Sequence, residues 1–349
     1  MQPAPSRLDS TIDRRLWGMR DLAPLFPDLT NQDPPIAEIW LTGASCRFAS
    51  GPLAGKELGE AWRSMPASWR GTRCASDDQI SLLVKFLFPG EKPSIQVHPD
   101  DAYAAEHEAA RGGRGKTEMW HVLSARPGAE LFVNLVPGVT PDSFRRAIDD
   151  ATLESLIARI PVVPGDTIFV PPGTVHTIGD GIMLCEIMEQ SDITYRVYDY
   201  KRKGPDGRER PLHVKQALDV INFGEQLGEK IRPVRRSSRG LTIDYLAACR
   251  YFATERWEFS GRIGGVTEPG SFELIVFLSG SGQIEHAGQK QPYSRTQVWF
   301  LPASLGAWQL EPAGPTVLLH TFVPDLDAYC RRLSDLGIPS DDWSRIIHL

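Results

Sequence analysis

The sequence predicts a mainly β protein made of two sandwich or barrel (jelly-roll) domains, with a few helices inserted in or flanking the first. Three observations lead to this fold class. Apolar runs of strand length recur along the chain, 28 Pro and 31 Gly supply many turns, and one strand-and-turn pattern occurs twice. The length of 349 residues is enough for two or three domains.

Strands are expected where short apolar runs are bounded by Gly, Pro, Asn or Asp. The clearest runs are SLLVKFLF (81–88), AELFVNLV (129–136), DTIFVPP (166–172), FELIVFLSG (272–280) and TVLLHTFV (316–323). Strand signals therefore occur in both halves of the chain.

Three segments favour helix instead. The segment 100–113 is rich in Ala and ends in a Gly pair, as helices often do. The segment 140–160 opens with Thr140 and Pro141 and carries apolar residues at near-helical spacing. The segment 213–223 shows the same spacing over a shorter length. We expect the helix at 140–160 to be an insertion in the first barrel.

The repeated pattern sets the expected domain organisation. In residues 163–178 a strand ends at a proline and a turn delivers His176, whereas residues 293–310 carry Ala307 and Trp308 at the corresponding place. Only the first copy therefore offers a ligand at this turn. We expect Trp308 to fill the interior of the second barrel.

A basic, Ser-containing stretch separates the two copies of the pattern. We interpret this stretch, 229–240, as a linker. The expected domains are therefore 1–235, which carries the candidate site, and 236–349, a degenerate copy without metal ligands.

Charge and composition exclude several classes of partner. The chain has 38 Lys and Arg against 44 Asp and Glu, and this net charge of −6 argues against a nucleic-acid or anionic-membrane partner. No uncharged apolar stretch approaches the roughly 18 residues of a membrane span, and the N-terminus lacks a secretory signal. Five scattered cysteines indicate reduced thiols, so we expect a cytoplasmic protein. Without coiled-coil heptads the sequence predicts no oligomeric state.

Candidate metal ligands lie in three separate segments. Gln96 and His98 are two residues apart, so on a strand they project from one face. Glu118 leads into an apolar strand, and His176 follows the PPGTVH turn. Two His, one Glu and an amide oxygen suit Zn²⁺, with Mn²⁺ or Fe²⁺ as alternatives, and match Ca²⁺ or Mg²⁺ poorly.

Further polar residues surround these ligands in the sequence. A run of polar residues follows the metal-binding turn at strand-like intervals and includes Glu186, Glu189, Asp192 and Arg196. Arg196 is placed to reach a substrate oxyanion or phosphate. Lys116 and Ser94 each lie two residues from a proposed ligand, where they would meet an anion at the rim of the site. The other six histidines are interpreted as ordinary surface or core residues: His107, His121, His213, His286, His320 and His348.

Several segments resemble a known family. The spacing from Gly165 to His176 resembles the second motif of the cupin superfamily, whose His is a metal ligand. The segments SIQVHPDDAYA, GKTEMWHVL and PPGTVHTIGDGIMLCEIMEQSDITYRVYDY resemble the signature segments of type I mannose-6-phosphate isomerases. RPLHVKQALDVI resembles the short bacterial form in particular, and the resemblance is strongest over residues 83–222.

The resemblance implies two cupin domains with one Zn²⁺ in the first. It implies that the metal is held by the residues Gln96, His98, Glu118 and His176. It further implies a catalytic arginine at Arg196 and polar active-site residues at Lys116, Glu186 and Asp192. The family reaction interconverts mannose 6-phosphate and fructose 6-phosphate through a cis-enediol, so a small sugar phosphate is the expected partner.

Other functions remain open from the sequence. A cupin with two His and a Glu could hold Fe²⁺ as a small-molecule dioxygenase, although a Gln ligand and the Lys116/Arg196 pair argue against it. The chain could also act on, or bind, another phosphorylated sugar. It could finally bind a sugar phosphate without turning it over. The general base is left open among Glu186, Asp192, Lys116 and a metal-bound water.

Overall fold

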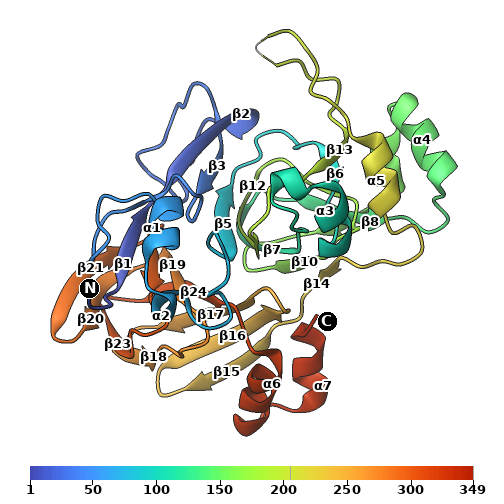
Figure 1. Ribbon diagram of the computed structural model, residues 1–349. Helices are drawn as coiled ribbons and strands as arrows, with labels where there is room; N and C mark the ends of the chain where they lie inside the picture. Colours follow the sequence, from blue (N-terminus) through green and yellow to red (C-terminus); the bar gives the residue numbers. More distant parts are fainter. Residues whose placement is uncertain (205, 349) are drawn as a thin grey trace. The chain divides into compact units, whose positions relative to one another are not determined.

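The computed structural model describes residues 1–204 and 206–348 and confirms a mainly β architecture (Figure 1). The chain divides into two compact units. The central unit comprises residues 12–39 and 85–230, and the C-terminal unit comprises residues 1–11, 40–84 and 231–349. None of the described helices is long and apolar enough to cross a lipid bilayer.

This division differs from the expected domains 1–235 and 236–349. The change of unit at residue 230 lies within the expected linker, but the segments 1–11 and 40–84 group with the C-terminal part of the chain. The reason is strand pairing and ring packing within that unit. β1 (Ser6–Asp9) pairs antiparallel with β22 (Val298–Leu301), and Trp62 of α1 (Leu58–Ser64) packs edge-to-face on Phe272 with ring centroids 5.3 Å apart.

Two sheets make up most of the central unit. The seven-stranded sheet has the order β14 (Glu229–Lys230), β10 (Thr167–Val170), β7 (Glu118–Ala125), β12 (Ile182–Glu189), β5 (Leu82–Leu87), β3 (Ile36–Trp40) and β2 (Thr11–Met19). The five-stranded sheet has the order β13 (Tyr195–Tyr198), β6 (Ile95–Val97), β11 (His176–Ile178), β8 (Glu130–Leu135) and β9 (Ile157–Pro161). The strands expected within 81–88, 129–136 and 166–172 are confirmed as β5, β8 and β10.

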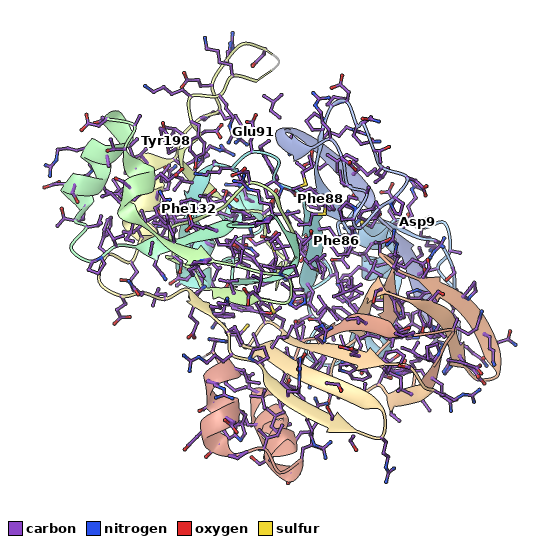
Figure 2. The ribbon with its side chains drawn as sticks, turned by 180° about the vertical axis from the view of Figure 1, so that it is seen from behind. Asp9, Phe86, Phe88, Glu91, Phe132 and Tyr198 are labelled. Carbon is purple, nitrogen blue, oxygen red and sulfur yellow. The ribbon has the colours of Figure 1, made fainter. Side chains whose placement is uncertain are left out.

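The core of the central unit has two parts. One apolar cluster joins side chains of both sheets, such as Trp120 of β7 and Val133 of β8, so the sheets face each other. A second cluster covers the other side of the five-stranded sheet, where Phe132 and Tyr198 pack with the helices (Figure 2). These helices are α3 (Asp101–His107), α4 (Pro141–Asp149) and α5 (Val214–Val220), drawn close to β6, β8 and β13 in Figure 1.

Two expectations about local structure are wrong in part. The helix expected at 140–160 ends at Asp149, because Ala151 adopts a positive φ of 57° and β9 pairs with β8 from Ile157 onwards. The apolar residues that suggested a longer helix instead lie in a 3₁₀ turn (Leu153–Leu156) and in β9. The expected linker 229–240 contains β14 and β15 (Val234–Ser238), and β15 pairs with β16 (Leu241–Ala248).

The C-terminal unit also contains two sheets. Its eight-stranded sheet has the order β15, β16, β17 (Ala253–Phe259), β24 (Thr316–Phe322), β19 (Glu273–Ser279), β22, β1 and β4 (Arg47–Phe48). Its four-stranded sheet has the order β18 (Ile263–Val266), β23 (Ala307–Pro312), β20 (Ser281–His286) and β21 (Gln289–Ser294). Its other helices are α2 (Ala67–Arg70), α6 (Leu326–Asp335) and α7 (Ser340–Trp343). The strands expected within 272–280 and 316–323 are confirmed as β19 and β24.

The two units repeat one strand pattern with different side chains. β10 and β22 both end immediately before a proline. In the central unit β6 pairs with β11 at Gln96 and His176, whereas β18 pairs with β23 at Gly265 and Trp308. Trp308 is 2% exposed and belongs to the apolar cluster of the C-terminal unit. The expectation that Trp308 fills the interior of the second barrel is therefore confirmed.

Candidate active site

Gln96 and His98 reach the interior of the central unit from the end of β6. Ile95 and Val97 are buried in the helix-covered cluster. Because successive side chains of a strand point to opposite faces, Gln96 and His98 point away from the helices, to the side on which the two sheets meet. His98 is 1% exposed there.

Glu118 and His176, the first residues of β7 and β11, meet His98 at this point. Glu118 Oε1 lies 3.4 Å from His176 Nε2, and Glu118 Oε2 lies 3.8 Å from His98 Nε2. One ligand atom from each of these three residues lies within 4.8 Å of the other two. Gln96 Nε2 lies 3.2 Å from His176 Nε2. The structure thus brings together all four residues expected to bind the metal, and we call them the metal cluster.

Hydrogen bonds on the far side of each imidazole set which nitrogen faces the cluster. Nδ1 of His98 donates to the carbonyl of Ile193 (2.8 Å), and Nδ1 of His176 donates to the carbonyl of Thr174 (2.9 Å). In a neutral ring the lone pair then lies on Nε2, which faces Glu118. Burial lowers the pKa of His176 to about 4, and burial together with Lys116 lowers the pKa of His98 well below its ordinary value. Both rings are therefore neutral at pH 7.

The donor set of the metal cluster fits a divalent transition metal. Both carboxylate oxygens of Glu118 are buried; Oε2 is paired with Lys116, and Oε1 has no hydrogen-bond partner among the described residues. A cation placed among the two Nε2 atoms and this carboxylate would satisfy Oε1, and such ligands suit zinc. Gln96 would ligate through Oε1, which requires its amide to turn over because Nε2 faces His176.

Lys116 and Glu186 lie beside the metal cluster. Lys116 Nζ lies 2.7 Å from Glu118 Oε2 and 3.9 Å from Glu186 Oε1, and Trp120 Nε1 donates to Glu186 Oε1 (3.1 Å). Burial by itself lowers the pKa of Lys116, but Glu118 and Glu186 outweigh it and raise that pKa. Burial raises the pKa of Glu186 to about 7 against the opposing effect of Lys116. The site therefore holds a buried cation and a buried carboxyl group side by side.

These groups line a cavity of 280 Å³ in the central unit. Further along the cavity wall, Lys85 Nζ lies 3.2 Å from Glu38 Oε2 and 3.6 Å from Asp192 Oδ1. The Asp192 side chain is 69% exposed, so it lies at the rim. The volume is close to that of pockets that take small polar ligands.

Arg196 and Ser94, which the sequence predicts to contact an anion, also line the cavity. Arg196 Nε donates to Ser94 Oγ (3.3 Å), and Arg196 Nη1 donates to the carbonyl of Pro211 (3.1 Å). Ser94 Oγ lies 3.5 Å from Gln96 Oε1. Glu189 does not line the cavity; its Oε1 instead accepts the backbone N–H of Thr117 (2.7 Å).

Lys85 was not among the residues expected in the cavity, although the sequence contains a signal for it. Lys85 is the one charged residue in the apolar run SLLVKFLF, and an isolated charge in a buried strand needs partners. Its neighbours Phe86 and Phe88 (Figure 2) pack edge-to-face on Phe26, with ring centroids 6.0 and 5.9 Å away. Alternation then turns Lys85 to the opposite face, where it lines the cavity.

His213, interpreted from the sequence as an ordinary surface or core residue, lines the cavity. Its Nδ1 accepts the backbone N–H of Arg196 (3.2 Å). Trp17 and Arg15 of β2 and Glu38 of β3 also line it. No local pattern could indicate these residues, because sheet pairing brings distant segments together.

Comparisons with known proteins agree with this fold. No protein-family model matches the chain. A mannose-6-phosphate isomerase from Streptococcus mutans is 33% identical over 88% of this chain and 95% of its own length. Mannose-6-phosphate isomerase ManA from Bacillus subtilis is 31% identical over 92% of this chain and its full length. The crystal structure of a mannose 6-phosphate isomerase from Bacillus subtilis superposes with a TM-score of 0.82 at 28% identity, covering 92% of this chain and 99% of that one. Together with the buried His–Glu–His cluster, these similarities identify the chain as an enzyme of the mannose-6-phosphate isomerase family.

Proposed function

We propose that the chain interconverts mannose 6-phosphate and fructose 6-phosphate through a cis-enediol, with one Zn²⁺ held by the metal cluster. The observation that carries the proposal is the position of the metal cluster beside Lys116 and Glu186 in one cavity. The names of the relatives supply the substrate pair.

The reaction moves a proton between C1 and C2 of the sugar, and a proton next to a carbonyl is only weakly acidic. A bound zinc ion would act as a Lewis acid that stabilises negative charge on the sugar oxygens. Glu186 is the proposed base, because it lies deep in the cavity at 4% exposure, whereas Asp192 lies at the rim. Lys116 would stabilise the developing oxyanion by its fixed positive charge.

Arg196 and Ser94 are proposed to bind the anionic part of the substrate. The guanidinium group of Arg196 offers paired N–H donors that match phosphate oxygens. Its hydrogen bond to Ser94 holds it beside Gln96 of the metal cluster. The position of Lys116, 2.7 Å from Glu118, favours a role at the reacting carbons over the phosphate contact that we also expected.

A sugar-phosphate-binding protein without activity is the weaker alternative. Burying Lys116, Glu118 and Glu186 together is unfavourable, since desolvation of each charge opposes folding by several kcal/mol. Binding alone would not require this arrangement. The same groups explain isomerisation directly, because both a proton carrier and a fixed positive charge are needed.

A coupled assay on zinc-loaded protein tests the proposal. We expect fructose 6-phosphate to form from mannose 6-phosphate, and the reverse reaction to proceed as well. His176→Ala should lose metal and activity together, whereas His107→Ala, which changes an exposed histidine of α3, should retain both. Zinc-loaded wild-type protein that forms no fructose 6-phosphate would refute the proposed function. A higher kcat/KM for another hexose phosphate would reassign the substrate.

A further inference from the structure

The cavity of the central unit is lined by two chemically different sets of residues. One set comprises His176 and Gln96 of the metal cluster with Lys116 and Glu186. The other set consists of cationic or imidazole side chains that line the same cavity from four separate segments: Arg15, Arg111, Arg196, Arg210 and His213. We call Arg15, Arg196 and Arg210 the arginine cluster.

Positive charge in the arginine cluster is incompletely neutralised. No carboxylate lies within 4.0 Å of the Arg196 guanidinium among residues 1–204 and 206–348, and its hydrogen bonds go to a hydroxyl and a carbonyl. Asp199 accepts two hydrogen bonds from Arg210 (2.6 and 2.7 Å) and also pairs with Arg202 (2.6 Å). Asp199 is thus shared by two guanidinium groups, of which Arg202 also lies 3.8 Å from Glu91 Oε2.

The cations of the arginine cluster act on one another electrostatically. Burial lowers the pKa of Arg196, and the neighbouring Arg210 and Arg15 lower it further against the opposing effect of Asp199. Burial also lowers the pKa of His213, with Arg196 adding to the effect, so this imidazole stays neutral and accepts the Arg196 N–H. A bound dianion would relieve this repulsion.

Arg15 enters the arginine cluster through the alternation of β2. Arg15 and Trp17 lie two residues apart and both line the cavity. Arg14 lies on the opposite face of the strand, where it donates to Gln32 Oε1 (3.0 Å) and to the carbonyl of Pro34. The carboxylate that pairs with Arg15 is Asp13 (2.8 Å), and the Arg15 side chain remains 53% exposed. Its guanidinium group is thus accessible at the opening of the cavity.

We propose that Arg15 and Arg210 complete, with Arg196, a phosphate subsite that selects phosphorylated sugars. This inference rests on the proposed function and names the residues that would bind the phosphate group of the substrate. In a hexose 6-phosphate the phosphate is at the opposite end from C1 and C2. With the phosphate on the arginine cluster, C1 and C2 would therefore face the metal cluster and Lys116. Three terminal phosphate oxygens can accept from several guanidinium groups at once.

The test compares Arg15→Ala with Arg14→Ala, which removes the same type of side chain from the other face of the same strand. Inorganic phosphate is titrated into each zinc-loaded protein by calorimetry. We expect Arg14→Ala to bind phosphate as the wild type does and Arg15→Ala to bind it about tenfold more weakly. Arg15→Lys should recover part of the loss, because it keeps the charge without the planar set of donors. Equal phosphate affinity in Arg15→Ala and Arg14→Ala would overturn the inference.

Steady-state kinetics provides the second readout. Arg15→Ala should raise the KM for mannose 6-phosphate about tenfold with little change in kcat, since the contact is equal in ground and transition states. Inhibition by unphosphorylated mannose should be the same in Arg15→Ala and Arg14→Ala. A loss of kcat at unchanged KM would contradict a phosphate contact. If the wild type turns over no mannose 6-phosphate, the proposed function fails, and the calorimetry still decides whether Arg15 belongs to an anion site.

Discussion

Lys116 is the residue on which the charge balance of the site depends. It is 4% exposed and lies between two buried carboxyl groups, those of Glu118 and Glu186. Without a metal it is the nearest cation to Glu118. With a metal bound, Glu118 would have a second positive partner. The two states should therefore respond differently when Lys116 is removed.

Lys116→Met should destabilise the metal-free protein by about 3–5 kcal/mol, because it leaves buried carboxyl groups without their cation. Zinc should raise the unfolding free energy of Lys116→Met by more than it raises that of the wild type. Isomerase activity of the variant should fall by at least about 10²-fold. Chemical unfolding with and without zinc measures both states. Lys92→Met is the control, since Lys92 pairs with Glu154 at 2.6 Å with both side chains 27% exposed. An unfolding free energy equal to that of the wild type would contradict this role.

At the scale of elements, the same strand-and-turn pattern positions a candidate metal ligand in one unit and a core side chain in the other. The turn after β10 delivers His176, and the turn after β22 leads to Trp308. The partner of His176 across the strands is Gln96, while the partner of Trp308 is Gly265. A Cβ on Gly265 would lie 2.6 Å from Cζ2 of Trp308. The glycine thus leaves room for the indole that occupies this position in the C-terminal unit.

This packing predicts a compensating pair of substitutions. Trp308→Ala should lower the unfolding free energy by about 3–5 kcal/mol, and Gly265→Ala by about 1–3 kcal/mol through the clash. In the double variant the clash is absent, so its loss of unfolding free energy should be smaller than the sum of the losses in the two single variants. Gly261→Ala is the control, because nothing lies within 4 Å of its added Cβ. Thermal unfolding measures all four proteins, and simple additivity would show that the two side chains do not meet.

A buried ionic group connects three neighbouring strands of the C-terminal unit. His320 Nε2 of β24 donates to Glu273 Oε2 of β19 (2.9 Å), and Nδ1 lies 3.8 Å from Glu255 Oε2 of β17. Glu255 also accepts hydrogen bonds from Tyr329 and Arg332 of α6. Burial by itself lowers the pKa of His320, but Glu273 and Glu255 outweigh it and raise the pKa to about 9.

The stability of the protein should therefore fall at alkaline pH. A histidine with a raised folded-state pKa stabilises the fold fully below its unfolded pKa of about 6.5, and this contribution is lost as pH rises through about 9. The loss is on the order of 3 kcal/mol for a shift of this size. His320→Gln should abolish the decline between these pH values, and His286→Gln, outside the ionic group, should keep it. Unfolding measured from pH 6 to 10 checks this, and an unchanged slope in His320→Gln would contradict it.

The elements differ in how far the sequence could predict them. Strands such as β5 and β19 were found because their apolar runs end at turn residues. The end of α4 was predicted too late in the sequence. Apolar residues between 153 and 157 have near-helical spacing, but they pack into the core from a 3₁₀ turn and a strand. The proximity of the residues of the metal cluster could be predicted from same-face spacing and from the family resemblance. Arg15 could not, because its position depends on which strands pair, whereas Lys85 carries a signal as the one charged residue of an apolar run.

At the scale of the whole molecule, segments that are far apart in the sequence belong to the same unit. β1 pairs with β22, and Phe48 packs edge-to-face on Phe300 with ring centroids 5.9 Å apart. These partners are more than 250 residues apart in the sequence, and no local sequence pattern predicts such pairings. The expected split of the chain near residue 235 therefore omitted the segments 1–11 and 40–84 from the C-terminal unit.

A fragment comprising residues 236–349 should not fold on its own. It would lack β1 and β4 of the eight-stranded sheet, and it would expose Phe272 and Phe300, which lie against Trp62 and Phe48 in the intact unit. We expect no cooperative thermal transition in the fragment, measured by circular dichroism, and recovery when residues 1–235 are supplied in trans. A cooperative transition of the isolated fragment would show that the C-terminal part is self-sufficient.

We propose that a metal held by Gln96, His98, Glu118 and His176 supports isomerisation of mannose 6-phosphate. Zinc titration of metal-free protein tests this requirement, with the rate of fructose 6-phosphate formation measured at each addition. We expect no activity without metal and a linear rise that saturates at one zinc per chain, because the cluster offers one set of ligands. Full activity in the metal-free protein, or no activity at any zinc concentration, would contradict it.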